Sequence, residues 1–268
     1  RSMHKNTLTL KQEINSQFDD SYDRIKHLKD KYKGETAYIL TSGPSINDVS
    51  EELLNEKLKD KLVLSIKQAI DKAPSITDYH LLNFCNLTRY NYTNKNTMVG
   101  WAVWDENQPN VIVQNFPCDF ILDTFKLNDG SPNLENSIAF NLDQFDLLDI
   151  NKSIPRPWGP GTIYELGIPL ALYFGCSKIV TLGWDLFKSS ISRYKNDEES
   201  LYQPHCYDNN NLEFKETNTS VTKKEIVKVI ESTKKLYYWL KDKNVELEIV
   251  DPHGDNPAYS KIKKIKTI

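Results

Sequence analysis

Short apolar runs recur along the chain, and segments with helical periodicity lie between several of them. The runs have the length of buried strands and predict strands over 36–40, 62–67, 79–83, 111–116, 178–184 and 246–250. Apolar residues spaced three and four apart predict helices over 46–60, 162–174 and 222–242. Strands that alternate with helices are typical of α/β proteins. We therefore expect a Rossmann-like, mostly parallel sheet with helices on both faces.

The first 33 residues carry a single apolar stripe at spacings of three and four. Its members are Ile14, Phe18, Tyr22, Ile25, Leu28 and Tyr32. This pattern predicts an N-terminal amphipathic helix within residues 1–33, which either packs on the domain or joins a partner. Residues 34–268 are expected to form one α/β domain with a small lid near 186–221. The stretch 91–160 is less regular and rich in Asn, Asp and Pro.

Composition and charge exclude some classes of function. A formal net charge of −3 gives no long-range attraction to nucleic acid, so no nucleic-acid partner is expected. The four cysteines have no metal-finger spacing, and no secretory apolar region is found near the start, so a cytoplasmic protein with reduced thiols is expected. The longest apolar run, 162–183, includes Glu165 and Lys178, which favours a helix–turn–strand unit over a membrane span.

Polar residues and glycine follow four of the predicted strands. Thr41–Ser45 follows the first strand, Lys67 closes the second, Asn83 closes the third, and Gly183–Asp185 comes at the end of a late strand. Ligands of open α/β sheets bind outside the carboxyl ends of the strands. These four strand ends therefore predict a polar site along one edge of the sheet.

The first of these strand ends contains Gly43, Pro44 and Ser45. Glycine permits close backbone approach, proline presets a first helical turn, and Ser45 can cap that helix. An ordinary capped turn and a site for an anionic ligand are both compatible with this motif. It is neither a dinucleotide fingerprint nor a P-loop.

The second motif covers residues 158–187, WGPGTIYELGIPLALYFGCSKIVTLGWDLF. Gly161 and Thr162 open a predicted helix, and Glu165, three residues after Thr162, completes a capping box. Gly183 and Asp185 end the strand that follows. Capping explains Thr162 and a turn explains Asp185, but their placement at the same predicted edge as Ser45 favours a second wall of one site.

The segments YILTSGPSINDV and GTIYELGIPLALYFGCSKIVTLGWDLF resemble the bacterial sialyltransferases of the Campylobacter type, glycosyltransferase family 42. They also resemble the related motility-accessory-factor proteins, which transfer nonulosonic acids. The resemblance spans residues 35–200 and is most specific in these two blocks. It implies an inverting glycosyltransferase that moves sialic acid or a related nonulosonic acid from a CMP-sugar donor to a glycan hydroxyl. It also implies no cofactor, because the CMP-sugar is a substrate. The chain has no Asp-x-Asp motif, which metal-dependent sugar-nucleotide transferases usually show, so no metal is expected.

The resemblance assigns donor-binding roles by position to Ser42, Gly43, Pro44, Ser45, Lys67, Asn83, Gly161, Thr162, Gly183 and Asp185. Those around Ser45 would lie near the donor phosphate, and Asn83 would contact the cytidine ribose or base. Lys67 replaces the asparagine typical of these enzymes and could supply a cation to a phosphate or a sugar carboxylate. Tyr194 matches the second of two tyrosines that hold the leaving phosphate, whereas Phe187 replaces the first.

Transfer to a hydroxyl needs a base, and histidine has a suitable pKa. His80 lies inside a predicted buried strand, which is more typical of a core residue. His205 lies in the polar loop where the resemblance places the base, and we assign it that role together with Tyr194 as the second catalytic residue. His253, at the end of the last predicted strand, remains the alternative base.

Two other functions fit the same motifs. One is a Mg²⁺-dependent diphosphokinase of the pterin type, from a related group that shares the Gly-Pro-Ser and Gly-x-Asp blocks; its chemistry needs carboxylates at the site. The other is a non-catalytic protein that binds nucleotide sugars. Peripheral membrane association and homo-oligomerisation both stay open.

Overall fold

The chain folds around a large parallel sheet. The computed structural model describes residues 8–84, 87–103, 105–126, 154–156, 166–186, 194–197, 199–202, 205–207 and 220–268. Its strands are β1 (Thr36–Leu40), β2 (Leu62–Ile66), β3 (Tyr79–Asn83), β4 (Met98–Val103), β5 (Phe120–Lys126), β6 (Ile154–Arg156), β7 (Lys178–Leu182), β8 (Ser200–Tyr202), β9 (Ser220–Thr222), β10 (Glu246–Val250) and β11 (Lys263–Ile265). Nine of these form one sheet in the order β11-β10-β7-β1-β2-β3-β4-β5-β6, and every neighbouring pair is parallel. The expected Rossmann-like α/β fold is confirmed. β8 and β9 form a separate antiparallel pair.

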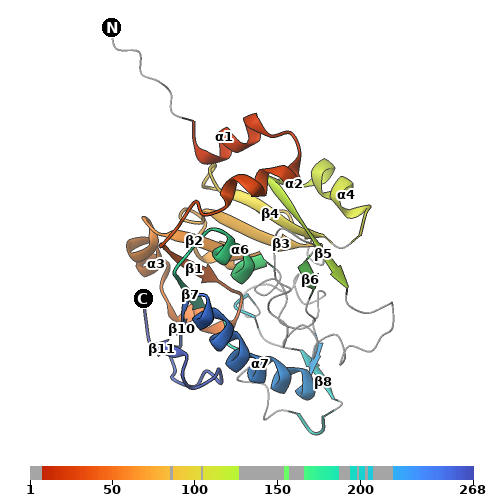
Figure 1. Ribbon diagram of the computed structural model, residues 1–268. Helices are drawn as coiled ribbons and strands as arrows, with labels where there is room; N and C mark the ends of the chain where they lie inside the picture. Colours follow the sequence, from red (N-terminus) through yellow and green to blue (C-terminus); the bar gives the residue numbers. More distant parts are fainter. Residues whose placement is uncertain are drawn as a thin grey trace.

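Helices cover both faces of this sheet (Figure 1). They are α1 (Leu10–Gln17), α2 (Ser21–Arg24), α3 (Glu51–Leu58), α4 (Gln108–Asn115), α6 (Ile168–Tyr173) and α7 (Lys223–Asp242), with 3₁₀ turns η1 (Ile25–Leu28), η2 (Pro44–Asp48) and η3 (Lys67–Lys72). Successive side chains of a strand point to opposite faces. Accordingly Ile39 packs in the core that contains α6 and α7, and Leu40 packs in the core that contains α3.

Three predicted strands, 36–40, 79–83 and 246–250, coincide with β1, β3 and β10. Central parallel strands are covered on both faces and so read as short continuous apolar runs. All five residues of β3 are buried, His80 among them. This explains why the strands of the sheet could be predicted from continuous apolar runs and not from an alternation of apolar and polar residues.

The predicted strand 111–116 is wrong, because this segment lies mainly in helix α4. Pro109 occupies the first turn, where proline is well accommodated in a helix. Gln108 and Ile112, four residues apart, are buried, whereas Val111 and Val113 are exposed. The run of β-branched residues suggested a strand, but burial follows helical spacing.

Two central strands, β4 and β5, lie within the stretch that the sequence pattern left irregular. Gly100 interrupts the apolar run of β4, and a Cβ atom there would overlap the ring of Phe120 on β5. Glycine inside a strand marks such a close approach. Gly100 therefore made β4 harder to predict, and it is also the residue that makes room for Phe120 of β5.

The predicted helix 46–60 is divided in two. The turn η2 ends at Asp48, Val49 has extended backbone, and α3 starts afresh after Ser50. The Ser50 hydroxyl accepts a hydrogen bond from the Leu53 amide at 3.1 Å, so Ser50 caps α3. Ser45, the expected cap, lies inside η2 and has a different partner.

The N-terminal segment is also divided, into α1, α2 and η1. Residues 15–20, Asn-Ser-Gln-Phe-Asp-Asp, contain poor helix formers, and the backbone is extended at Phe18. The apolar stripe nevertheless packs on the domain, because Ile14, Ile25 and Leu28 join the same core as β1 and α6. These three residues of the stripe therefore pack on the domain.

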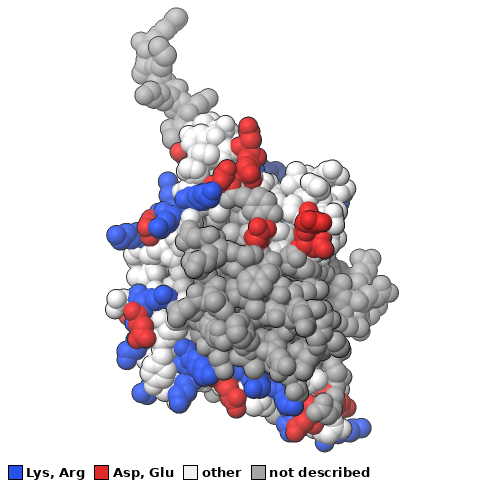
Figure 2. Space-filling view, turned by 45° about the vertical axis from the view of Figure 1, so that its right-hand side comes forward, with Lys and Arg blue, Asp and Glu red and all other residues white. Residues whose placement is uncertain are grey.

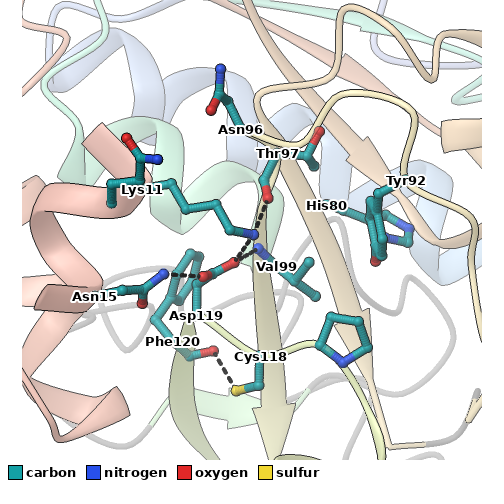
Figure 3. Close-up of polar contacts among 12 residues, drawn as sticks. Lys11, Asn15, His80, Tyr92, Asn96, Thr97, Val99, Cys118, Asp119 and Phe120 are labelled. Carbon is teal, nitrogen blue, oxygen red and sulfur yellow. Dashed lines mark hydrogen bonds and ion pairs between the residues drawn. The ribbon is translucent and has the colours of Figure 1, made fainter. Parts of the chain in front are cut away.

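Asp119 fastens this N-terminal segment to the sheet (Figure 3). It is buried, and its carboxylate accepts hydrogen bonds from Lys11 Nζ at 3.0 Å, Asn15 Nδ2 at 2.7 Å and the Val99 amide at 2.7 Å. Lys11 also donates to the Thr97 carbonyl at 2.7 Å. One carboxylate thus joins α1 to the start of β4.

Positive and negative side chains are interspersed over the described surface in the view of Figure 2. This agrees with the small net charge of the chain. Among the described residues, no helix is both long enough and apolar enough to span a bilayer.

Replacement of Asp119 by alanine should lower the free energy of unfolding by about 3 kcal/mol, because it removes the partner of a partly buried ammonium group and of a buried amide. Urea denaturation at neutral pH measures this. The control is Lys26→Ala, which breaks an exposed ion pair with Asp23 and should leave the midpoint unchanged. Equal effects of the two substitutions would contradict the anchoring role.

Candidate functional site

The site is built where the order of the strands changes direction. From β1 the chain adds β2, β3, β4, β5 and β6 in turn on one side, and then returns to place β7 on the other side of β1. The carboxyl ends of β1 and β7 consequently lie next to each other with their connections leading to opposite sides. In open parallel sheets such a switch point is the usual place for a ligand.

The turns after β1 and β7 are in direct backbone contact. The Thr41 amide donates to the Leu182 carbonyl at 2.8 Å, and the Gly43 amide donates to the Gly183 carbonyl at 2.9 Å. A Cβ atom on Gly43 would overlap the Gly183 carbonyl oxygen. Gly183 has φ +74°, and a Cβ atom there would overlap the Thr41 carbonyl oxygen. Mutual packing of the two turns therefore accounts for glycine at both positions.

Ser45 and Asp185 form the polar link between these turns. The Ser45 amide donates to Asp185 Oδ2 at 2.9 Å, and the Ser45 hydroxyl donates to Asp185 Oδ1. The amide and the hydroxyl of Ser45, a residue expected near the donor phosphate, are thus both bonded to a carboxylate. Since a carboxylate can accept about four hydrogen bonds, Asp185 retains acceptor capacity for a hydroxyl or amino group.

The segment His205–Tyr207 packs against the first turn. The Cys206 amide donates to the Ser42 carbonyl at 2.7 Å, and Asn47 Nδ2 donates to the Cys206 carbonyl at 2.9 Å. The half-buried His205 ring stacks on Tyr207 with centroids 5.1 Å apart. These bonds hold the backbone next to His205 against the end of β1.

Lys67 directly follows β2, and Asn83 ends the neighbouring strand β3 at the same edge of the sheet. Asn83 is buried, and Lys67 is half-buried. The four strand ends with polar residues or glycine therefore lie on adjacent parallel strands, β7, β1, β2 and β3, and form one polar edge. It consists of the turns after β1 and β7 and the two residues at the ends of β2 and β3.

His80 lies inside β3 and bonds to this edge through Lys67, a contact that the sequence pattern did not reveal. Its Nε2 lies 2.8 Å from the Lys67 carbonyl and its Nδ1 lies 2.5 Å from the Tyr92 hydroxyl. Burial lowers the pKa of His80 to about 4, so the ring is neutral at pH 7. Because a carbonyl only accepts, the proton is on Nε2 and Tyr92 donates to Nδ1. The available signal was a histidine inside a buried strand, which must find polar partners.

Tyr194 contacts α7, and His253 contacts the turn η2. Tyr194 is buried, and its side chain belongs to a small apolar cluster with Ile226 of α7. His253, which follows β10, is exposed and bonds through Nε2 to Asp48 Oδ2 at 2.8 Å. The assigned roles of Tyr194 and His205 in catalysis stay predictions.

Several expected site residues lie outside the described residues, namely Gly161, Thr162, Glu165 and Phe187. Most of the expected lid, 186–221, does so as well. Within the described ranges, no three His, Cys, Asp or Glu side chains come together in a group that could hold a metal ion.

Comparison with known proteins identifies structural neighbours at low similarity. No protein-family model matches the chain, and neither does any curated protein sequence. The MAf glycosyltransferase from Magnetospirillum magneticum AMB-1 is 12% identical, with a TM-score of 0.45 over 92% of this chain. The sialyltransferase CstII from Campylobacter jejuni, solved with the substrate analogue cytidine-5′-monophosphate, is 13% identical, with a TM-score of 0.38 over 88% of this chain.

This chain spans 38% of the MAf glycosyltransferase and 92% of CstII. Both neighbours are glycosyltransferases by name.

Gly43→Ala should destabilise the protein by about 3 kcal/mol, because the new methyl group meets backbone that no side-chain rotation can clear. Gly34→Ala is the matched control: Gly34 has φ +80° and open space around its Cβ position, so only the left-handed backbone is penalised, at about 1 kcal/mol. Urea denaturation of both variants measures the difference. An equal loss in the two would argue against close contact between the turns after β1 and β7.

Proposed function

We propose that this chain is an inverting glycosyltransferase that moves sialic acid or a related nonulosonic acid from a CMP donor to a glycan hydroxyl. The proposal is carried by the direct contact between the two segments that resemble the sialyltransferases, one around Ser45 and the other around Asp185. Gly43 bonds to Gly183 and Ser45 bonds to Asp185, although about 140 residues separate the partners. The junction lies at the switch point of the sheet, where nucleotide ligands of this fold class bind.

The proposed reaction is a direct displacement at the anomeric carbon. The acceptor oxygen forms a bond to that carbon while the bond from the carbon to the phosphate oxygen breaks, and the electron pair leaves with CMP. The acceptor proton passes to His205, whose backbone segment is bonded to the end of β1. Attack from the face opposite the leaving group inverts the configuration.

The negative charge that develops on the leaving phosphate needs hydrogen-bond donors. We assign this role to Lys67, Tyr194 and the segment around Thr162. Ser45 is bonded to Asp185 in this structure, so we assign that pair to the wall beneath the nucleotide, where the carboxylate can accept from a ribose hydroxyl or the cytosine amino group. Asn83, at the end of β3, would also contact the nucleoside.

CMP should stabilise the protein more than UDP or ADP. A ligand present at 100 times its Kd adds about 2.7 kcal/mol to the free energy of unfolding, which corresponds to a rise of roughly 5–10 °C in Tm for a domain of this size. Thermal unfolding with each nucleotide, with and without Mg²⁺, measures this. Equal responses to all three would remove the CMP assignment, and a preference for ADP with Mg²⁺ would favour the diphosphokinase.

His205→Ala should lower kcat for transfer from CMP-N-acetylneuraminic acid to glycan acceptors by about 10²- to 10⁴-fold, the usual contribution of a general base. The Kd for CMP should stay the same, because the base acts on the acceptor. The comparison variant is His253→Ala, which removes the imidazole bonded to Asp48. A loss confined to His253→Ala would transfer the role of base to His253. Undetectable transfer by the wild type, together with CMP binding, would favour the non-catalytic alternative.

A further inference from the structure

Lys67 has an unusual backbone conformation for its residue type. Its φ is +50°, in the left-handed region that glycine and asparagine enter far more readily than lysine. Among the described non-glycine residues, this region is also occupied by Asp30, Leu186 and Asn244, of which Leu186 directly follows Asp185. Strained backbone of this kind persists where the surroundings enforce it, and it is common at functional sites.

Side chains from the turn after β1 and from β3 bond to the backbone on either side of the Lys67 Cα atom. From the β1 side, the Ser42 hydroxyl donates to the Ile66 carbonyl at 3.4 Å. From β3, His80 Nε2 donates to the Lys67 carbonyl at 2.8 Å. The carbonyl groups of Ile66 and Lys67, which flank the Lys67 Cα atom, therefore each accept a hydrogen bond from a side chain of a neighbouring segment. The His80 contact is the shorter of the two.

His80 is itself immobilised. It is fully buried, the Tyr92 hydroxyl bonds to its Nδ1 at 2.5 Å, and the Tyr90 ring meets it edge-on with centroids 4.5 Å apart. Figure 3 shows His80 and Tyr92 side by side. The neutral ring keeps one N–H at physiological pH, and the Lys67 carbonyl receives it. Because the ring cannot move, its hydrogen bond holds the Lys67 carbonyl in place at the end of β2.

We propose that His80 is a positioning residue, which holds the backbone of Lys67 so that the lysine ammonium group binds an anionic oxygen of the donor. This inference rests on the proposed function, since it names one determinant of donor binding at the same site. The anionic oxygen belongs either to the phosphate or to the carboxylate of the sugar. Lysine offers three N–H donors and a compact charge, which an asparagine at this position would not supply.

The first experiment measures binding by calorimetry in the full chain. Lys67→Asn keeps a residue that tolerates left-handed backbone and removes the charge. It should weaken CMP binding about 10- to 100-fold, the usual effect of losing a charged hydrogen bond. Lys72→Asn is the matched control in the same turn η3 and should bind CMP as the wild type does. If only a non-cleavable CMP-sialic acid analogue loses affinity, the carboxylate is the partner, and the proposal holds for that group.

The second experiment tests positioning by coupling. His80→Leu should reproduce the loss of affinity seen in Lys67→Asn, and should cause no further loss when added to Lys67→Asn. His80→Gln, which can place an N–H near the position of Nε2, should restore most of the affinity. If His80→Leu does not fold, Tyr92→Phe replaces it: loss of the hydroxyl frees the ring, weakens CMP binding several-fold in the wild type, and has no effect in Lys67→Asn.

The outcomes separate this inference from the proposed function. Wild-type affinity of Lys67→Asn for both CMP and the analogue overturns the inference and leaves the function standing. Equal losses from His80→Leu, or from Tyr92→Phe, in both backgrounds show a merely structural role and overturn positioning. If the wild type prefers UDP or ADP and this binding is weakened by Lys67→Asn to the same extent, the assignment of a CMP donor is wrong and the role of His80 stands. Binding of none of the three nucleotides overturns both.

Discussion

The close approach of two backbone turns, at Gly43 and Gly183, is the constraint on which the rest of this edge depends. The carbonyl of one turn accepts from the amide of the other, and a single methyl group at either position would separate them. With the turns in contact, Ser45 reaches Asp185. Because β1 and β7 are neighbours in a parallel sheet, this contact also fixes where their connections diverge.

From that junction, hydrogen bonds continue across the sheet in both directions. The Ser42 carbonyl accepts from Cys206, which brings the segment of His205 to the end of β1. The Ser42 hydroxyl donates to β2, and His80 on β3 donates to the residue that follows β2. The edge thus combines a carboxylate, a cation and a histidine segment on elements that are bonded to each other. Preorganised groups of this kind need little rearrangement when charge develops during a reaction.

The central part of the fold was predictable because parallel strands are buried on both faces and appear as apolar runs. β1, β3 and β10 follow this rule. The sequence of α7 keeps the helical spacing of apolar residues over a long segment. Prediction failed where the local residue pattern suggested a different structure from the one that tertiary packing selects. Gly100 interrupted β4 because Phe120 needs the space, and the β-branched residues of α4 mimicked a strand although Pro109 starts a helix there.

At the site, strand ends could be recognised from polar residues and glycine, but bonding partners could not. Gly43 was expected to permit close backbone approach, and in the structure it permits the close approach of Gly183. Ser45 was expected to cap a helix, whereas its hydroxyl and amide bond to Asp185. Such pairings depend on tertiary contacts between distant segments, which local patterns do not encode. The burial of His80 between the two polar partners Lys67 and Tyr92 belongs to the same class.

The position of β1 in the middle of the sheet has a consequence for biosynthesis. Thr41 and its partner Leu182 are 141 positions apart, and translation at about 5–20 residues per second needs on the order of ten seconds to cover that distance. During this interval one edge of β1 has no native neighbour, while the strands on its other side are already available. Exposed strand edges recruit foreign strands. The open edge of β1 is therefore a site where the nascent chain can pair with a foreign strand until β7 has been translated.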